Sequence, residues 1–162
     1  MNIPILVRLT EHDMALAAKV GAMRMRSSGN TGRNPHRSQE GRSDGHRLWH
    51  ETLGCMAEAA VARHLGIPYA GTVNTFHNEP DVGPFDVRGT DRADGRLILR
   101  DNDPANRPYV LAINDGRLPV VRLVGWLYGW EGRDRRWLRN PHGRRPCWMV
   151  PQNELHPVPP GN

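Results

Sequence analysis

The sequence predicts a mixed α/β fold of the α+β type, because helical patterns occupy its first half and strand patterns its second half. In residues 10–26 and 47–65, apolar side chains recur about every three to four positions, which is typical of the buried face of a helix. After residue 84, short runs of β-favouring residues alternate with turns rich in Gly, Pro, Asn and Asp. A chain of 162 residues can bury a core as one domain.

Both helices carry boundary signals. Thr10 is the expected N-cap of the first, and two acids follow in its first turn, where the helix dipole favours negative charge. The second helix ends at Gly66, with Pro68 just beyond it. Residues 27–46 between the helices contain no large apolar side chain and predict a mobile loop, either an inert linker or a basic segment that wraps DNA.

This loop separates an N-terminal helical segment, residues 1–26, from a core over residues 47–158. Residues 159–162 form a short tail.

The second half predicts a series of strands and one short helix. The strands are expected at 85–89, 96–100, 109–113, 120–124 and 148–150, and the helix within 131–139. Asp94-Gly95 is a hairpin turn signal, so the first two strands are expected to pair. In the first strand, alternation places Asp86 and Arg88 on one face and Val87 on the core face.

The charge balance favours an anionic partner. Lys and Arg outnumber Asp and Glu by 22 to 17, the net charge is +5 and the pI is about 10.0, so nucleic acid is the first candidate. Only Lys19 is a lysine. Arginine suits bidentate phosphate binding, and a GC-rich genome would produce the same bias.

The remaining composition predicts a protein of the cytoplasm. Cys55 and Cys147 are too few for a disulfide framework. The sequence shows neither a signal peptide nor an apolar run near the roughly 20 residues of a membrane span.

An acidic constellation stands out in residues 79–90. Asp81 lies in a turn, Asp86 and Arg88 share a strand, and Glu58 sits among alanines in the middle of the second helix. Carboxylates that converge on one point are ligands for a hard metal ion that promotes phosphodiester hydrolysis. The alternative is a solvated turn with an ordinary surface ion pair, and a Glu58 that simply faces solvent.

The order of these motifs resembles the PD-(D/E)XK nuclease superfamily, in particular its small phage-encoded members. The matching features, over about residues 50–156, are Gly54 to Glu58 on a helix, Pro80-Asp81, Asp86-Val87-Arg88, an arginine-flanked strand at 96–100, and the segments 109–111, 125–129 and 150–152.

The resemblance implies a restriction-endonuclease-like mixed central β-sheet flanked by helices, and a nuclease that cuts DNA with Mg²⁺ or Mn²⁺. Asp81 is then the central metal ligand and Asp86 the second. Glu58 is either a helix-borne metal ligand or an acid that lies just behind the ligands, and Arg88 occupies the position of the family's lysine. A phage-encoded nuclease of this kind acts in the cytoplasm of a bacterial host.

Arg88 is the main departure from that family. Arginine stays charged and cannot act as a base, although it can clamp a phosphate or orient water. Arg96 or Arg100 could supply the missing charge. The alternative is therefore a catalytically inactive nucleic-acid-binding or phage-assembly protein with the same fold.

Further contacts to nucleic acid are expected from arginines that lie among aromatic residues. The arginines proposed for this role are Arg96, Arg100, Arg133, Arg135, Arg136 and Arg139, and the aromatic residues are Trp126, Tyr128, Trp130, Trp137 and Trp148. Such interleaving suits stacking on unpaired bases. Packing against the sheet is the favoured explanation for Trp126 and Trp148.

Overall fold

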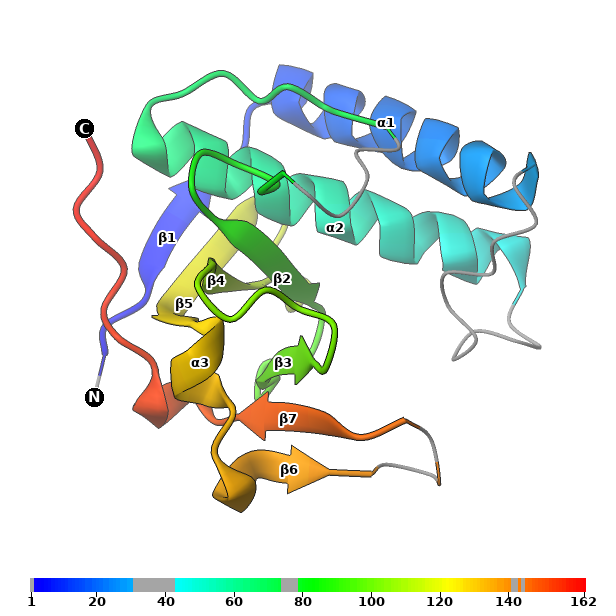
Figure 1. Cartoon of the computed structure of the whole chain (residues 1–162). Coiled ribbons are helices and arrows are strands. Elements are labelled where there is room, and N and C mark those ends of the chain that lie inside the picture. The colour runs from blue at the N-terminus through cyan, green and yellow to red at the C-terminus, as the bar shows by residue number, and fades with distance from the viewer. Residues whose placement is uncertain (1, 31–42, 74–78, 141–142, 144) are drawn as a thin grey trace.

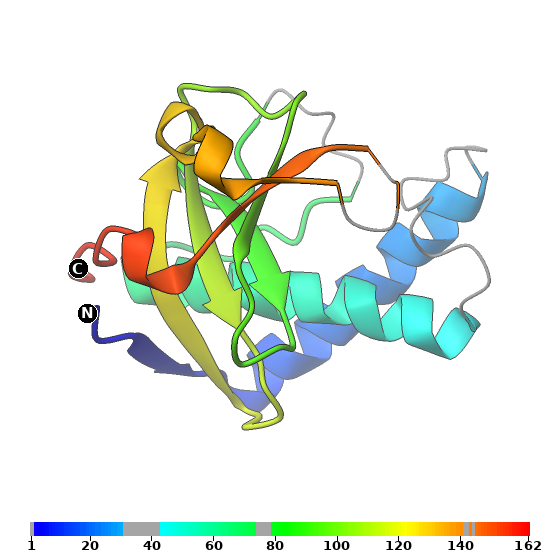
Figure 2. The same ribbon diagram turned by 90° about the horizontal axis from the view of Figure 1, so that it is seen from below.

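The structure is a computed structural model, and it describes residues 2–30, 43–73, 79–140, 143 and 145–162. Its elements form three layers (Figures 1 and 2). Two long helices cover one face of a four-stranded sheet, and a three-stranded sheet covers the other face. The predicted α+β class is confirmed.

The first helix begins, and the second ends, with the predicted signals. In α1 (Glu11–Asn30), the Thr10 hydroxyl accepts the Asp13 N–H at 3.1 Å, and the Asp13 carboxylate accepts the Thr10 N–H at 2.8 Å. α2 (Asp44–Leu65) ends at Gly66, whose φ of 69° is left-handed.

The helices take up both ends of the predicted loop. Residues 27–30 continue α1, and residues 44–46 begin α2, capped by the Ser43 hydroxyl. The loop prediction was too long there. At α2 the reason is local: residues 44–46 are exposed, and the Ser43 cap with Asp44 in the first turn starts the helix before residue 47. The rest of the predicted loop, 31–42, lies outside the described residues.

The larger sheet is mixed, with the order β1-β5-β4-β2. Its strands are β1 (Ile5–Arg8), β5 (Val120–Tyr128), β4 (Pro108–Ile113) and β2 (Asp86–Thr90). β1 and β4 pair antiparallel with β5, and β2 pairs parallel with β4. The N-terminal segment thus supplies both an edge strand and a helix to the same body as the core.

The smaller sheet has the order β3-β7-β6 and is antiparallel. Its strands are β3 (Leu97–Arg100), β7 (Cys147–Val150) and β6 (Leu138–Arg139). A short helix, α3 (Gly129–Gly132), and a 3₁₀ turn at Arg135–Trp137 lead into β6. They replace the single helix expected within 131–139, because Leu138 and Arg139 pair with β7.

The predicted hairpin between 85–89 and 96–100 is wrong. The turn forms, with the Gly95 N–H donated to the Arg92 carbonyl at 3.0 Å, but β3 pairs with β7 and not with β2. The reason is burial: Leu97 and Leu99 are fully buried and pack against the face of the main sheet that lies opposite the helices. β3 therefore belongs to the second layer.

Strand β4 shows how the layers are joined. Tyr109, Leu111 and Ile113 pack toward the small sheet, and Val110 and Ala112 toward the helices. A strand that is buried on both faces reads as a continuous apolar run.

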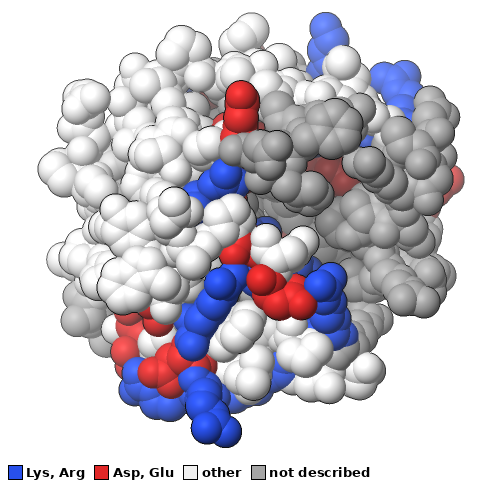
Figure 3. Space-filling view, viewed as in Figure 1, with Lys and Arg blue, Asp and Glu red and all other residues white. Residues whose placement is uncertain are grey.

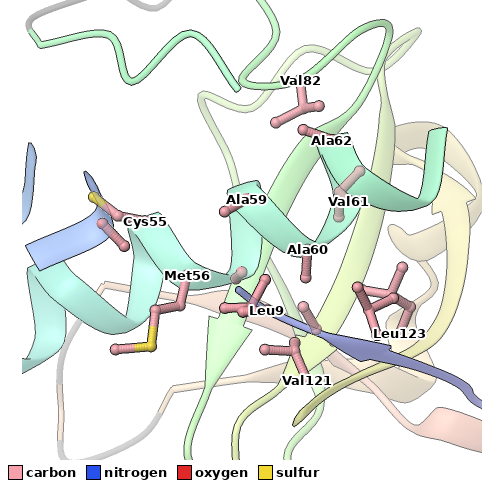
Figure 4. Packing of buried hydrophobic residues seen from close by; sticks show 14 of the residues in the cluster. Leu9, Cys55, Met56, Ala59, Ala60, Val61, Ala62, Val82, Val121 and Leu123 are labelled. Carbon is pink, nitrogen blue, oxygen red and sulfur yellow. The ribbon is translucent and has the colours of Figure 1, made fainter. Parts of the chain in front are cut away.

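Helix α2 lies close to the main sheet because its inner face is built from alanine. Figure 4 shows Ala60 on the side of α2 that faces Leu9, Val121 and Leu123. A Cβ built at Gly89 of β2 would lie only 3.1 Å from the Cβ of Ala57. This approach brings the middle of α2, including Glu58, next to β2. Among the described helices, none is both long and apolar enough to span a membrane.

Candidate active site

Asp81 and Asp86 stand on either side of a tight turn. Val82 and Phe85 exchange backbone hydrogen bonds of 3.0 and 2.9 Å, with Gly83 between them at a φ of 54°. The chain thereby folds back on itself, and the Asp81 carboxylate accepts the Val87 N–H at 2.9 Å. The short spacing of the two acids in the sequence is thus compatible with side chains that lie close together.

The pKa of Asp81 is raised to about 6. Desolvation is the largest cause, followed by the negative charge of Glu58, and the charge of Asp86 adds to it. The bond from Val87 N–H and the charge of Arg88 act in the opposite direction. The residue as a whole is exposed, so solvent access limits the desolvation. The contributions of Glu58 and Asp86 to this shift show that both acids lie close enough to Asp81 to repel its negative charge.

Glu58 is buried, with 6% of its surface exposed, and it is held by an arginine. Arg24 of α1 binds it with both Nη atoms, at 2.8 Å to Oε1 and 2.9 Å to Oε2. The Tyr69 hydroxyl donates to Oε2 at 3.2 Å. Arg24 also donates from Nε and Nη2 to the Thr72 carbonyl, at 3.0 and 2.8 Å. The alternative of a solvent-facing Glu58 is wrong.

Asp86 forms an ion pair with an arginine that sequence reasoning missed. Arg107 Nη1 lies 3.2 Å from Oδ2 and 3.5 Å from Oδ1 of Asp86, and both side chains are largely buried. Neither Arg24 nor Arg107 belongs to a motif. The signal that could have found them is general: a buried carboxylate requires a nearby cation.

Arg88 shares a face with Asp86, as strand alternation predicts, but the two do not pair. Arg88 Nη2 binds Asp103 Oδ1 at 2.8 Å, and its guanidinium lies 5.1 Å from the centre of the Tyr109 ring. Its Nε is buried without a hydrogen-bond partner in the described part of the chain. Arg88 is thus anchored by Asp103 beside the acids.

The carboxylate oxygens of Glu58, Asp81 and Asp86 are the kind of ligand that a hard divalent cation prefers, but their arrangement suits such a cation only in part. Mg²⁺ keeps several waters and takes one or two carboxylates, which Asp81 and Asp86 offer. In the described part of the chain, Asp81 is the only one of the three acids outside an ion pair. No group of three or more His, Cys, Asp or Glu side chains there is arranged to hold a metal ion. Direct ligation by Glu58 would require Arg24 to move.

The arginines expected to contact nucleic acid divide into two groups. Arg133 turns inward: its Nη2 donates to three carbonyls, those of Arg100, Asp101 and Asp103, and it stacks on Trp148 at 5.5 Å. Arg136 is exposed but pairs with Asp134 and stacks on Trp137. The others, Arg96, Arg100, Arg135 and Arg139, are exposed. Figure 3 shows acidic and basic side chains intermixed on one face, without a patch of a single sign.

The aromatic residues expected near these arginines include both packed and exposed side chains. Trp126 packs on the helix-side core, with its Nε1 donating to the Pro157 carbonyl at 3.0 Å, and Trp148 packs on the core of the small sheet. Packing, the favoured explanation for both, is confirmed. Tyr128 and Trp130 are exposed.

No protein-family model matches this chain, and searches of curated proteins and of solved structures give no significant match.

Proposed function

We propose that the protein is a metal-dependent nuclease that hydrolyses phosphodiester bonds in DNA. The observation that carries the proposal is the position of Asp81 beside two other carboxylates: desolvation raises the pKa of Asp81 most, and the charges of Glu58 and Asp86 raise it further. Mutual repulsion of this kind is relieved when a divalent cation binds, and hard cations prefer carboxylate oxygen. The mixed main sheet with helices on one face agrees in part with the proposed restriction-endonuclease-like architecture. Its other face is covered by the small sheet and not by helices, and β2 pairs with β4 and not in the expected hairpin.

The residues have separate tasks under this proposal. Asp81 and Asp86 hold the metal, which when bound supplies an activated water and neutralises charge on the phosphate. Arg88 remains protonated and acts as a fixed cation toward the phosphate, not as a base. Glu58, held by Arg24, contributes a fixed negative charge that favours cation binding next to Asp81.

The test is cleavage of supercoiled plasmid and of linear DNA in Mg²⁺ or Mn²⁺. Asp81→Asn keeps a side-chain acceptor for the Val87 N–H and removes the charge, and we expect it to lower the rate at least about a hundredfold. Asp94→Asn is the matched control, because Asp94 is exposed in the 92–95 turn, and its rate should equal the wild type. A wild type that does not cut, or an Asp81→Asn variant that cuts equally well, would overturn the proposal.

The second candidate is a nucleic-acid-binding protein that does not cut. The ion pairs favour it: Arg24 and Arg107 already neutralise Glu58 and Asp86, which leaves a single acid for a metal. Titration calorimetry with Mn²⁺ separates the candidates. The nuclease should bind Mn²⁺ in a way that Asp81→Asn abolishes, whereas the binding protein should show no such difference and should bind DNA equally well in EDTA.

A further inference from the structure

Four aromatic rings form a row that begins at the acidic turn. The ring centres of Phe85 and Trp126 are 6.0 Å apart, those of Trp126 and Tyr128 are 5.2 Å apart, and those of Tyr128 and Trp130 are 6.3 Å apart. The first two pairs meet edge to face, at interplanar angles of 81° and 80°. The last pair is stacked, at 12°.

Exposure rises along the row. Phe85 is 8% exposed, Tyr128 37% and Trp130 63%. The inner rings therefore serve the core, while the outer pair presents aromatic surface to solvent. Exposing an indole forgoes burial energy that a packed position would provide, so a large exposed aromatic pair marks a binding surface more often than a lone apolar side chain does.

The outer pair is held by a rigid support. The Gly129 N–H donates to the Arg107 carbonyl at 3.0 Å, and the Trp130 N–H donates to the Ala105 carbonyl at 2.9 Å. The Tyr128 N–H donates to the Glu131 carboxylate at 2.7 Å. A binding surface that is held before the ligand arrives loses little entropy when it binds.

Two connections through the backbone link the row of rings to the acids. Phe85 directly precedes Asp86, and its backbone is bonded to Val82, which directly follows Asp81. Arg107 pairs with Asp86 through its side chain and receives the Gly129 N–H through its carbonyl. The outer rings and the acidic turn are therefore held by one connected set of backbone segments.

The charge of the molecule indicates which polymer this is. The net charge is +5, and exposed arginines of the adjoining 3₁₀ turn and β6, Arg135 and Arg139, follow Trp130 closely in the chain. An anionic polymer with flat apolar groups complements exposed rings next to arginines. In a duplex the base faces are covered by neighbouring bases, so only unpaired bases can stack on a protein ring.

We propose that Tyr128 and Trp130 form a stacking platform for unpaired bases, so that the protein prefers nucleic acid with a single-stranded segment. The substrate preference rests on the proposed nuclease function, whereas the platform itself does not.

The test measures binding without cleavage. Fluorescence anisotropy in EDTA follows a labelled 12-nucleotide oligo(dT) and a labelled 12-base-pair duplex. Trp130→Ala should weaken oligo(dT) binding by about tenfold and leave duplex binding within about twofold, because stacking contributes only to unpaired bases. Trp130→Phe should restore most of the affinity. Leu138→Ala is the control, since Leu138 is an exposed apolar side chain of β6 outside the row, and it should change neither affinity.

Three outcomes would overturn the platform: no oligo(dT) binding by the wild type, equal binding by Trp130→Ala, or equal losses for oligo(dT) and duplex. Light scattering adds a fourth, a wild-type dimer that Trp130→Ala dissociates, which would assign the rings to self-association. Because EDTA removes the metal, a failed nuclease with intact oligo(dT) binding would reject only the proposed function. Intact cleavage with unchanged Trp130→Ala binding would reject only the platform.

Discussion

Glu58 lies inside the protein, where the guanidinium of Arg24 binds both of its carboxylate oxygens and the Tyr69 hydroxyl adds a third contact. Asp81 lies on an exposed turn nearby, where one backbone N–H is its hydrogen-bond donor among the described residues and its charged neighbours include two other acids. The first acid is neutralised by the fold. The pKa of the second is raised to about 6, first by desolvation and then by the like charges of Glu58 and Asp86.

This difference separates structural acids from chemically available ones. A buried carboxylate with its own arginine is a fixed part of the fold, because removing either partner leaves an uncompensated charge. A solvent-accessible carboxylate beside other acids can still gain free energy from an added cation.

The largest effect is expected from breaking the Arg24–Glu58 pair. Arg24→Met should lower the free energy of unfolding by about 3–5 kcal/mol, because it leaves Glu58 buried and charged. The double variant Arg24→Met, Glu58→Met should recover much of this loss. Urea unfolding followed by circular dichroism measures both. Equal losses in the single and double variants would show that the pair is not coupled. Arg63→Met removes a more exposed ion pair with Asp13 and should cost less than about 1 kcal/mol.

A smaller effect is expected at Asp86. Its distances to Arg107, 3.2 and 3.5 Å, are longer than those of the Glu58 pair. Asp86→Asn should therefore lower the free energy of unfolding by about 2 kcal/mol, since it removes a charge-assisted interaction and keeps a polar group in place. The same urea titration applies. A loss greater than that of Arg24→Met would make Asp86 the main structural acid.

Added metal should stabilise the protein through Asp81. At about ten times its Kd, Mg²⁺ should raise the free energy of unfolding by about 1.4 kcal/mol at pH 8. The gain should shrink at pH 5, below the pKa of about 6, because a proton then competes for Asp81. Urea titrations with Mg²⁺, compared with NaCl of equal ionic strength, measure this. A gain that persists in Asp81→Asn would place the metal elsewhere.

The smallest effect is the pH dependence of Asp81→Asn without metal. The folded pKa of about 6 is above the usual 3.8, so the stability that protonated Asp81 contributes is complete below pH 3.8 and is lost as the pH rises through about 6. The neutral variant should therefore be more stable than the wild type at pH 8, by at most about 1 kcal/mol because solvent reaches the turn. The advantage should vanish near pH 3.5.

Asp94→Asn is a control, because the pKa of Asp94 is lowered whereas that of Asp81 is raised. Arg92 lowers the pKa of Asp94, so its charged form stabilises the fold at neutral pH and the variant should gain nothing at pH 8. If the two variants showed the same pH dependence, general surface charge and not crowding at Asp81 would explain the result.

Local features could be predicted from the sequence because they depend on neighbours a few residues away. The Thr10 cap starts α1 and the left-handed Gly66 ends α2, each through hydrogen bonds within one turn. The strands that became β2, β3 and β4 were placed to within one residue at each end, since alternation and turn residues are local signals. β1 was missed, because four residues are too short for a clear pattern.

The pairing of strands into sheets and the formation of ion pairs could not be predicted in the same way. Whether Leu97 and Leu99 pack beside β2 or in a second layer depends on which sheet face lacks a cover, and that is known only after the helices cover the other face. Arg24 reaches Glu58 across 34 residues, and Arg107 reaches Asp86 across 21. No local pattern distinguishes these two arginines from the nineteen other arginines or from Lys19.

The sequence by itself determined the two helices, most strands of the second half and the tight acidic turn, because periodicity, caps and turn residues act over short distances along the chain. It did not predict β6, where a helix was expected, or the full length of β5. Only the tertiary structure decided that Glu58 and Asp86 are ion-paired, that Asp81 forms no ion pair with any described residue, and that Tyr128 and Trp130 face solvent. Charge neutralisation and exposure depend on distances in space between segments that are remote in the chain.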